Sequence, residues 1–226
     1  MGFLDELRAQ AEAVQSRRRE DEADFERHAL ATDEACKRAF HYWLDLARQL
    51  DVLRPPVPGR YAFDARHVLD GPAEGLRFED FQVDARRMRL RGLELYDHAV
   101  IGCRVRGGRR IALAKDFPAE IERLDARLAQ AGVVVAGEPQ RDEAGRLREM
   151  RYDFEADVHV GVRLVPEHAA ARVRFDCRNL EGLATIGIEF AAADVDTALL
   201  DELARWWLGR PNGFVAAGRV VAVEEP

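Results

Sequence analysis

The 226-residue sequence predicts an α+β fold: antiparallel sheets in two pseudo-repeated units, each a strand meander followed by one helix, preceded by a helical N-terminal region. Apolar residues recur at helical spacing over residues 3–50. They alternate with polar residues, as in half-buried strands, over much of residues 80–190. We therefore divide the chain into a helical region (1–53), an antiparallel α+β domain (60–209, with halves 60–132 and 133–209) and a tail (210–226). Whether the tail forms an added strand or is disordered is left open.

The N-terminal region is expected to hold two helices. The first, over residues 3–30, is highly charged. Arg18 and Asp21 interrupt its apolar stripe, which is too narrow for a coiled coil and consists of Leu4, Leu7, Ala11, Val14 and Phe25. Thr32 is a suitable N-cap for the second, amphipathic helix, which must end before the prolines of residues 53–59. Whether the first helix projects or folds back onto the sheet is left open.

Two turns are expected in the first group of strands. Before residues 84–87 the apolar residues have odd numbers (Phe81, Val83), and after them they have even numbers (Met88, Leu90). This change indicates a turn between two strands. The glycine pair within residues 107–109 suggests a second hairpin. A three-residue loop there keeps Val105 and Ile111 on one face, whereas a two-residue loop does not, so we prefer the longer loop.

One helix follows each group of strands. The first covers residues 117–131, with Asp116 as its expected cap and Gly132 as its stop. The second group of strands begins at residues 133–135. Its closing helix is expected to start after Asp194 and carries leucines and two tryptophans on one face.

Residue counts exclude several classes of enzyme. Ser16 is the only serine and lies in a charged run, where a nucleophile would lack a base and an oxyanion site. The chain has no P-loop, GxGxxG, HExxH or paired CxxC motif, so no cofactor is expected. No stretch reaches the roughly 20 apolar residues of a membrane span. Three widely spaced cysteines favour reduced thiols and a cytoplasmic location.

Basic residues concentrate in residues 85–115, which hold nine of them against two acidic residues. In the preferred hairpin Arg106 would lie opposite Arg110, and like charges opposed across two strands are unfavourable. One interpretation is a site for a negatively charged partner, formed by Arg87, Arg89, Arg104, Arg106 and Arg110. The other, which we favour, is a surface lattice of ion pairs with acids such as Asp153 and Glu155. The acidic balance of the whole chain also argues against nucleic acid.

Histidines and carboxylates meet in two short segments. Asp64 precedes His67 by three residues, and Asp97 directly precedes His98. Together these four side chains could form a pocket for acid–base chemistry or for a metal ion. The spacing alone does not bring the two segments together, so the pocket is a hypothesis.

Three segments resemble a group of uncharacterised proteins from GC-rich proteobacteria. They are MGFLDELRAQAEAVQ at the start, HYWLDLARQLDVL before the prolines and LDELARWWLG near the end. The resemblance covers most of the chain. It implies a bacterial, cytosolic protein, and it implies neither an activity nor functional residues.

The sequence thus favours a non-enzymatic protein that binds another protein, or associates with itself, through residues 1–30. A first alternative is a small-ligand binder or enzyme with a pocket between the sheet and its helices. A second alternative is anion or nucleic-acid binding by the arginine-rich segment. The charged, interrupted first helix and the lack of a catalytic motif decide this order.

Overall fold

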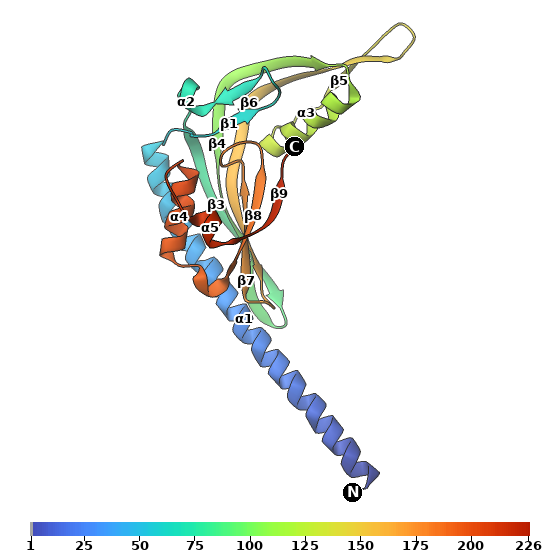
Figure 1. Ribbon diagram of the computed structural model, residues 1–226, viewed down its shortest axis with the longest axis vertical. Helices are drawn as coiled ribbons and strands as arrows, with labels where there is room; N and C mark the ends of the chain where they lie inside the picture. Colours follow the sequence, from blue (N-terminus) through green and yellow to red (C-terminus); the bar gives the residue numbers. More distant parts are fainter. Residues whose placement is uncertain (1) are drawn as a thin grey trace.

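A computed structural model describes residues 2–226 and shows a seven-stranded antiparallel sheet that curves into a crescent, with a long helix projecting from one end (Figure 1). The predicted α+β class, the antiparallel pairing and the preceding helical region are confirmed. The strand order is β3 (Phe78–Leu90), β4 (Leu93–Lys115), β6 (Leu147–Glu167), β7 (Arg172–Arg178), β8 (Thr185–Ala191) and β9 (Arg219–Glu224). The short β5 (Glu138–Arg141) pairs with the start of β6. The tail therefore adds a strand to the sheet.

The helices are α1 (Phe3–Leu53), α2 (Gly71–Glu74), α3 (Pro118–Ala131), α4 (Thr197–Trp207) and α5 (Phe214–Ala217). A separate hairpin joins β1 (Arg60–Ala62) to β2 (Val68–Asp70). Both predicted halves of the chain, 60–132 and 133–209, contribute strands to the one large sheet. Their junction is the long pairing of β4 with β6.

The core lies on one face of the long strands. Every second residue of β6 from 152 to 164 is buried, as the alternation in the sequence predicts. Near one end of the sheet, Trp43 of α1 meets Phe175 of β7 edge to face at 6.4 Å. Further along, Phe63 from the β1–β2 connection packs on Phe154 at 5.2 Å. The three cysteines are buried and unpaired.

The hairpin predicted at residues 107–109 is wrong, because β4 continues through this segment and pairs with β6 instead. Val105 lies opposite Val158, and Ile111 lies opposite Phe154. Between these two pairs β4 has more residues than β6, and the surplus forms a β-bulge. The core face stays continuous without a reversal of the chain.

The two glycines of this segment serve the bulge rather than a turn. A Cβ on Gly107 would lie 2.5 Å from the carbonyl oxygen of Ala156 and 2.6 Å from the side chain of Leu69. Gly108 has a φ of +61°, in the left-handed region that favours glycine. Glycine, which suggested a hairpin turn in the sequence, here allows β4 to lie close to both β6 and the β1–β2 hairpin.

The turn predicted at residues 84–87 is also wrong. β3 is continuous, and its register with β4 shifts between Arg86 and Arg87, where Asp97 of β4 is the surplus residue of a β-bulge. The chain reverses at Arg91 and Gly92 instead, where φ is +48° and +88°. Two successive positive φ values suit the two-residue type I′ turn that joins twisted antiparallel strands.

Three local predictions about helix starts need correction. α1 is one helix, so Thr32 is not an N-cap; it is buried, and its hydroxyl donates to the carbonyl of Ala29 at 2.9 Å. Phe117, not Asp116, precedes α3 as its N-cap residue.

The start of α4 also differs from the prediction. Asp194 lies in a short 3₁₀ turn, and Asp196 caps α4. Residues 133–135, expected to begin a strand, form a loop.

Two carboxylates of α1 hold the helix to the sheet at its bulges. Asp33 accepts a hydrogen bond from the backbone N–H of Tyr96 at 2.8 Å, beside the bulge at Arg86 and Arg87. Asp51 accepts one from the N–H of Phe81 at 3.1 Å, within the second irregularity of β3. Bulges leave strand N–H groups without a ladder partner, and each carboxylate supplies the missing acceptor.

Replacing Asp33 with alanine should lower the free energy of unfolding by about 1–3 kcal/mol, because the N–H of Tyr96 loses its acceptor in a partly buried position. Urea denaturation followed by tryptophan fluorescence measures this change. Asp45→Ala is the matched control, since Asp45 is an exposed residue of the same helix that pairs with Arg48 at 3.1 Å. It should change stability by less than about 0.5 kcal/mol. Equal losses in both variants would contradict the assignment.

Candidate functional site

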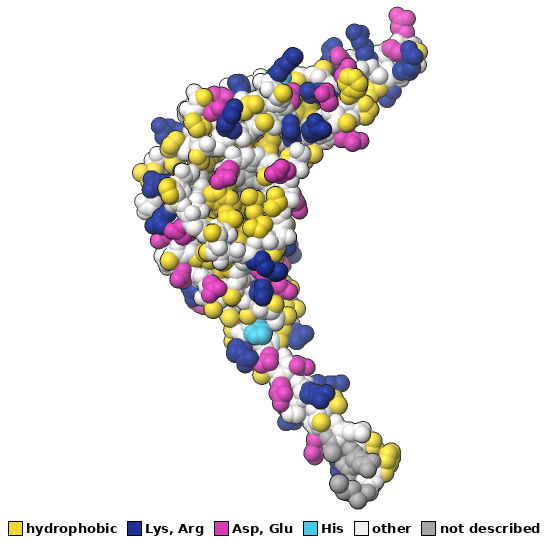
Figure 2. Space-filling model, in the orientation of Figure 1, with side chains coloured by type: hydrophobic (Ala, Val, Ile, Leu, Met, Phe, Trp, Pro, Cys, Tyr) yellow, Lys and Arg dark blue, Asp and Glu magenta, His cyan; other side chains and the backbone are white. Residues whose placement is uncertain are grey.

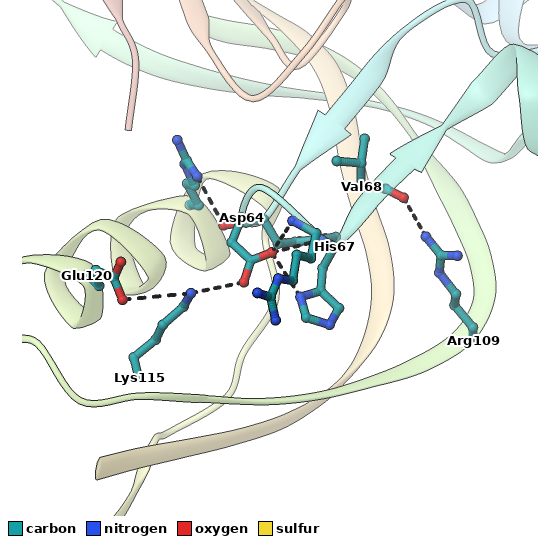
Figure 3. A network of polar contacts seen from close by, with 9 residues as sticks. Asp64, His67, Val68, Arg109, Lys115 and Glu120 are labelled. Carbon is teal, nitrogen blue, oxygen red and sulfur yellow. Dashed lines mark hydrogen bonds and ion pairs between the residues drawn. The ribbon is translucent and has the colours of Figure 1, made fainter. Parts of the chain in front are cut away.

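The first predicted pair, Asp64 and His67, comes together in the connection between β1 and β2 (Figure 3). His67 Nδ1 lies 2.9 Å from Asp64 Oδ1, which also accepts the backbone N–H groups of Arg66 and His67 at 2.8 Å each. Lys115, at the end of β4, places its Nζ 3.0 Å from Asp64 Oδ2 and 3.9 Å from Glu120 of α3. Asp64 thus ties the hairpin to β4.

The electrostatics of Asp64 fit a structural role. Burial by itself raises the pKa of the carboxyl group, but the two backbone N–H groups, Lys115 and His67 outweigh it and hold the pKa well below its usual range. A carboxylate with four donors around it has little capacity left to accept a proton from a substrate. The pair therefore stabilises a tight turn more readily than it supports acid–base catalysis.

A cavity of about 340 Å³ lies beside this network. Its polar lining consists of Asp64, Lys115, Glu120, Arg123 and Arg127. The ion pairs of Lys115 with Asp64 and Glu120, and the hydrogen bond from Arg127 to the carbonyl of Phe63 at 3.2 Å, engage four of these groups with each other and with the chain. The cavity is small, and its charges are mixed.

The second predicted pair lies elsewhere on the sheet. His98 Nδ1 is 2.8 Å from Asp97 Oδ2 and 3.3 Å from Arg163 on β6. His98 precedes Lys115 by 17 residues on the same strand, which at about 3.3 Å per residue amounts to roughly 56 Å along β4. The structure therefore forms each histidine–carboxylate pair but not the joint pocket that the sequence suggested. Among the described side chains, no three potential metal ligands converge.

The arginines of the proposed anion site are distributed along β3 and β4, and Arg87, Arg106 and Arg110 form ion pairs with carboxylates. Arg106 does not face Arg110, because both lie on β4; Arg106 pairs with Asp80 and Arg110 with Asp153. Arg87 lies 3.6 Å from Asp33 and 3.5 Å from Glu94. Arg89 lies opposite Glu94, and Arg104 lies opposite His159. The ion pairs of Arg87, Arg106 and Arg110 are of the kind that the sequence favoured, whereas Arg89 and Arg104 are only placed by their strand register.

The first part of α1 lies outside the packed body of the fold. We call residues 3–24 the projecting segment: Figure 1 shows it extending away from the sheet, and every described side chain in it is exposed. It nevertheless carries a row of large apolar side chains, Phe3, Leu4, Leu7 and Val14, of which Phe3 is 73% and Leu4 68% exposed. The segment projects, which settles the alternative that the sequence left open.

The base of the projecting segment is held by contacts with β4. Phe25 and Ala29 are buried against Leu95 of β4, and Arg91 lies 4.1 Å above the ring of Phe25. Phe25 continues the stripe of Leu4, Leu7, Ala11 and Val14, so the sheet covers the stripe only from Phe25 onward.

A histidine network fixes the direction in which the segment leaves the sheet. His168 is buried in the turn between β6 and β7; its Nδ1 is hydrogen-bonded to Thr32 Oγ1 at 2.6 Å, and its Nε2 donates to the carbonyl of Tyr96 at 2.9 Å. His28 contacts the carbonyl of Ala169 in the same turn at 2.9 Å. No local signal could have identified these residues, because their partners are far away in the sequence.

The pKa of Asp64 leads to a prediction about acid stability. The pKa of this carboxyl group is lower in the folded chain than in the unfolded chain, where it is about 3.9. Ionised Asp64 therefore stabilises the fold above pH 3.9, and this contribution is lost as the pH falls further. Asp64→Asn should therefore be less stable than the unchanged protein at pH 7, and its stability should fall less between pH 4 and pH 2. Urea midpoints across this range measure both effects. Asp116→Asn, an exposed neighbour, should retain the original pH dependence.

Comparisons with protein-family models, curated proteins and solved structures find no match for this chain. Among residues 2–226, none of the helices is both long and apolar enough to cross a membrane. The geometry of the chain itself is therefore the basis for a functional assignment.

Proposed function

We propose that the chain is a non-enzymatic binding protein whose projecting segment inserts its apolar row into a groove of another protein. The observation that carries this proposal is the continuity of one stripe along α1: the sheet buries it at Phe25, and the same face stays uncovered at Leu4, Leu7 and Val14. Four apolar side chains at helical spacing are the anchors of helix-in-groove recognition. From Phe3 to Val14 the row spans about 17 Å.

A partner of a different sequence fits the segment better than a second copy of it. Arg18 and Asp21 stand on the stripe and limit the apolar overlap of two such helices to about two heptads, which is too short for a stable pair of isolated helices. In a parallel pair the basic run of residues 17–19 would also face itself. Self-association through the segment is therefore the less favoured outcome, and the experiment below distinguishes it.

The base of the segment supports the proposal because it orders the helix before binding. Packing at Phe25 and Ala29 and the hydrogen bonds of Thr32 and His28 continue α1 outward as one helix. A helix that is already formed loses less conformational entropy on binding than a disordered peptide does. We place the protein in the cytoplasm, in keeping with its three reduced, buried thiols.

A photoreactive amino acid at Leu7 should cross-link the full chain to its partner in cell lysate, whereas the same group at Ser16 should not. Position 16 lies on the opposite side of the helix from the apolar row. Mass spectrometry of the cross-linked product identifies the partner, and a product made of two copies of this chain would favour self-association instead.

The double change Leu4→Glu and Leu7→Glu should then weaken binding to the identified partner by about 100-fold or more, because each buried leucine contributes about 1.5–3 kcal/mol. Ala13→Glu with Ser16→Glu is the matched control on the opposite side and should bind normally. Circular dichroism checks that both variants keep α1 helical. Unchanged binding by the leucine variant, or equal loss in both variants, would refute the proposal.

A further inference from the structure

The hollow of the crescent holds a second cavity besides the one described beside Asp64. Its volume is about 420 Å³, and its lining includes Leu180, Leu183, Ile186 and Trp206. Figure 2 shows hydrophobic side chains gathered in this hollow, where Figure 1 places β8 and β9. We call this space the apolar cavity, and the one beside Asp64 the charged cavity.

The two cavities adjoin at Ala62 of β1 and Arg127 of α3, because both residues line both cavities. The volumes, about 340 and 420 Å³, each fall within the range of about 300–1,000 Å³ that small-molecule sites occupy. Together the cavities offer room for one elongated ligand that passes Arg127.

The charged cavity leaves two arginines free to bind an anion. Its carboxylates, Asp64 and Glu120, lie 3.0 and 3.9 Å from Nζ of Lys115, which stands between them in Figure 3. Arg123 and Arg127 line the same cavity, and no described carboxylate lies within ion-pair distance of either. Arg127 donates one N–H to a backbone carbonyl, so its other donors are available.

The spacing of these two arginines suits one negative group. Arg123 and Arg127 are four residues apart on α3, so they lie on one side of the helix, and like charges at this spacing destabilise it. A carboxylate between them removes the repulsion and accepts hydrogen bonds from both guanidinium groups. The cationic side chains of the cavity outnumber its carboxylates by one, which matches a monoanion.

The charges of the apolar cavity determine which part of a ligand lies there. It contains two carboxylates, Glu181 and Glu225, and its Arg60 is already paired with Asp70 at 2.8 Å. Glu181 accepts the N–H of Trp206 at 2.7 Å. An anionic group is therefore disfavoured in this cavity, whereas an alkyl chain gains free energy by covering its apolar lining.

We propose that the two cavities bind one long-chain carboxylate, with its head between Arg123 and Arg127 and its alkyl chain in the apolar cavity. The observation that commits the site to this ligand is the division of unpaired positive charge and apolar lining between two adjoining cavities. The site goes beyond the proposed role of α1 and uses no residue of the projecting segment.

Isothermal titration calorimetry of the full chain with decanoate, below its critical micelle concentration, tests the proposal. One decanoate should bind per chain. Hexanoate should bind at least tenfold more weakly, because each methylene that leaves water raises the affinity by up to about fourfold. Decanol, which has the same chain without the charge, should also bind at least tenfold more weakly than decanoate.

Replacing both arginines, Arg123→Gln with Arg127→Gln, should weaken decanoate binding about tenfold and leave decanol binding unchanged, because only the head loses its partners. Leu183→Glu should weaken the binding of both ligands, since it places a charge in the apolar cavity. Arg146→Gln is the matched control and should bind decanoate normally, because Arg146 is an exposed residue that pairs with Asp142 in the turn between β5 and β6.

Three results would overturn the proposal: no binding of decanoate, equal affinity for decanoate and decanol, or an affinity that does not depend on chain length. The single change Arg123→Gln guards against a loss of fold, because Arg123 has no described partner, and it should still weaken decanoate binding about threefold. The variant with glutamate at Leu4 and Leu7 should bind decanoate normally, so a failure of this site is distinguishable from a failure of the proposed function.

Discussion

Two carboxylates on one face of α1 accept hydrogen bonds from strand N–H groups that bulges leave without partners. Asp33 and Asp51 lie about five helical turns apart, so both point toward the sheet while β3 and β4 run beneath them. An unsatisfied buried N–H costs about 1–3 kcal/mol, which makes these positions specific docking points. They set the position of the helix along the strands, and the core around Trp43 and Phe175 forms in that position.

The length of α1 then determines what is left uncovered. A helix of 51 residues extends roughly 77 Å, and the sheet covers it only from Phe25 onward. The apolar stripe continues beyond the part of α1 that the sheet covers. Leu4, Leu7 and Val14 lie on this continuation and are therefore exposed. The continuous helix and the network of His168 and Thr32 keep this row in line with the buried part.

The surface proposed for protein binding lies apart from the charged network of the sheet. The projecting segment offers apolar side chains at helical spacing. The charged groups elsewhere, from Asp64 to Arg110, are largely engaged with one another and stabilise the turns and strands that carry them.

The sequence by itself determined the α+β class, the apolar face of α1 and which alternate residues of β6 are buried. It also placed Asp64 near His67 and Asp97 near His98. These features depend on residues that are close together in the chain. The tertiary structure decided whether Gly107 and Gly108 form a turn or a bulge, since that depends on pairing with Val158 and Phe154 about fifty residues later. The pairing of β4 with both β3 and β6 replaced an expected repulsion of arginines by ion pairs with Asp80 and Asp153. Periodicity shows which side of a strand is buried, but only long-range packing selects its neighbour.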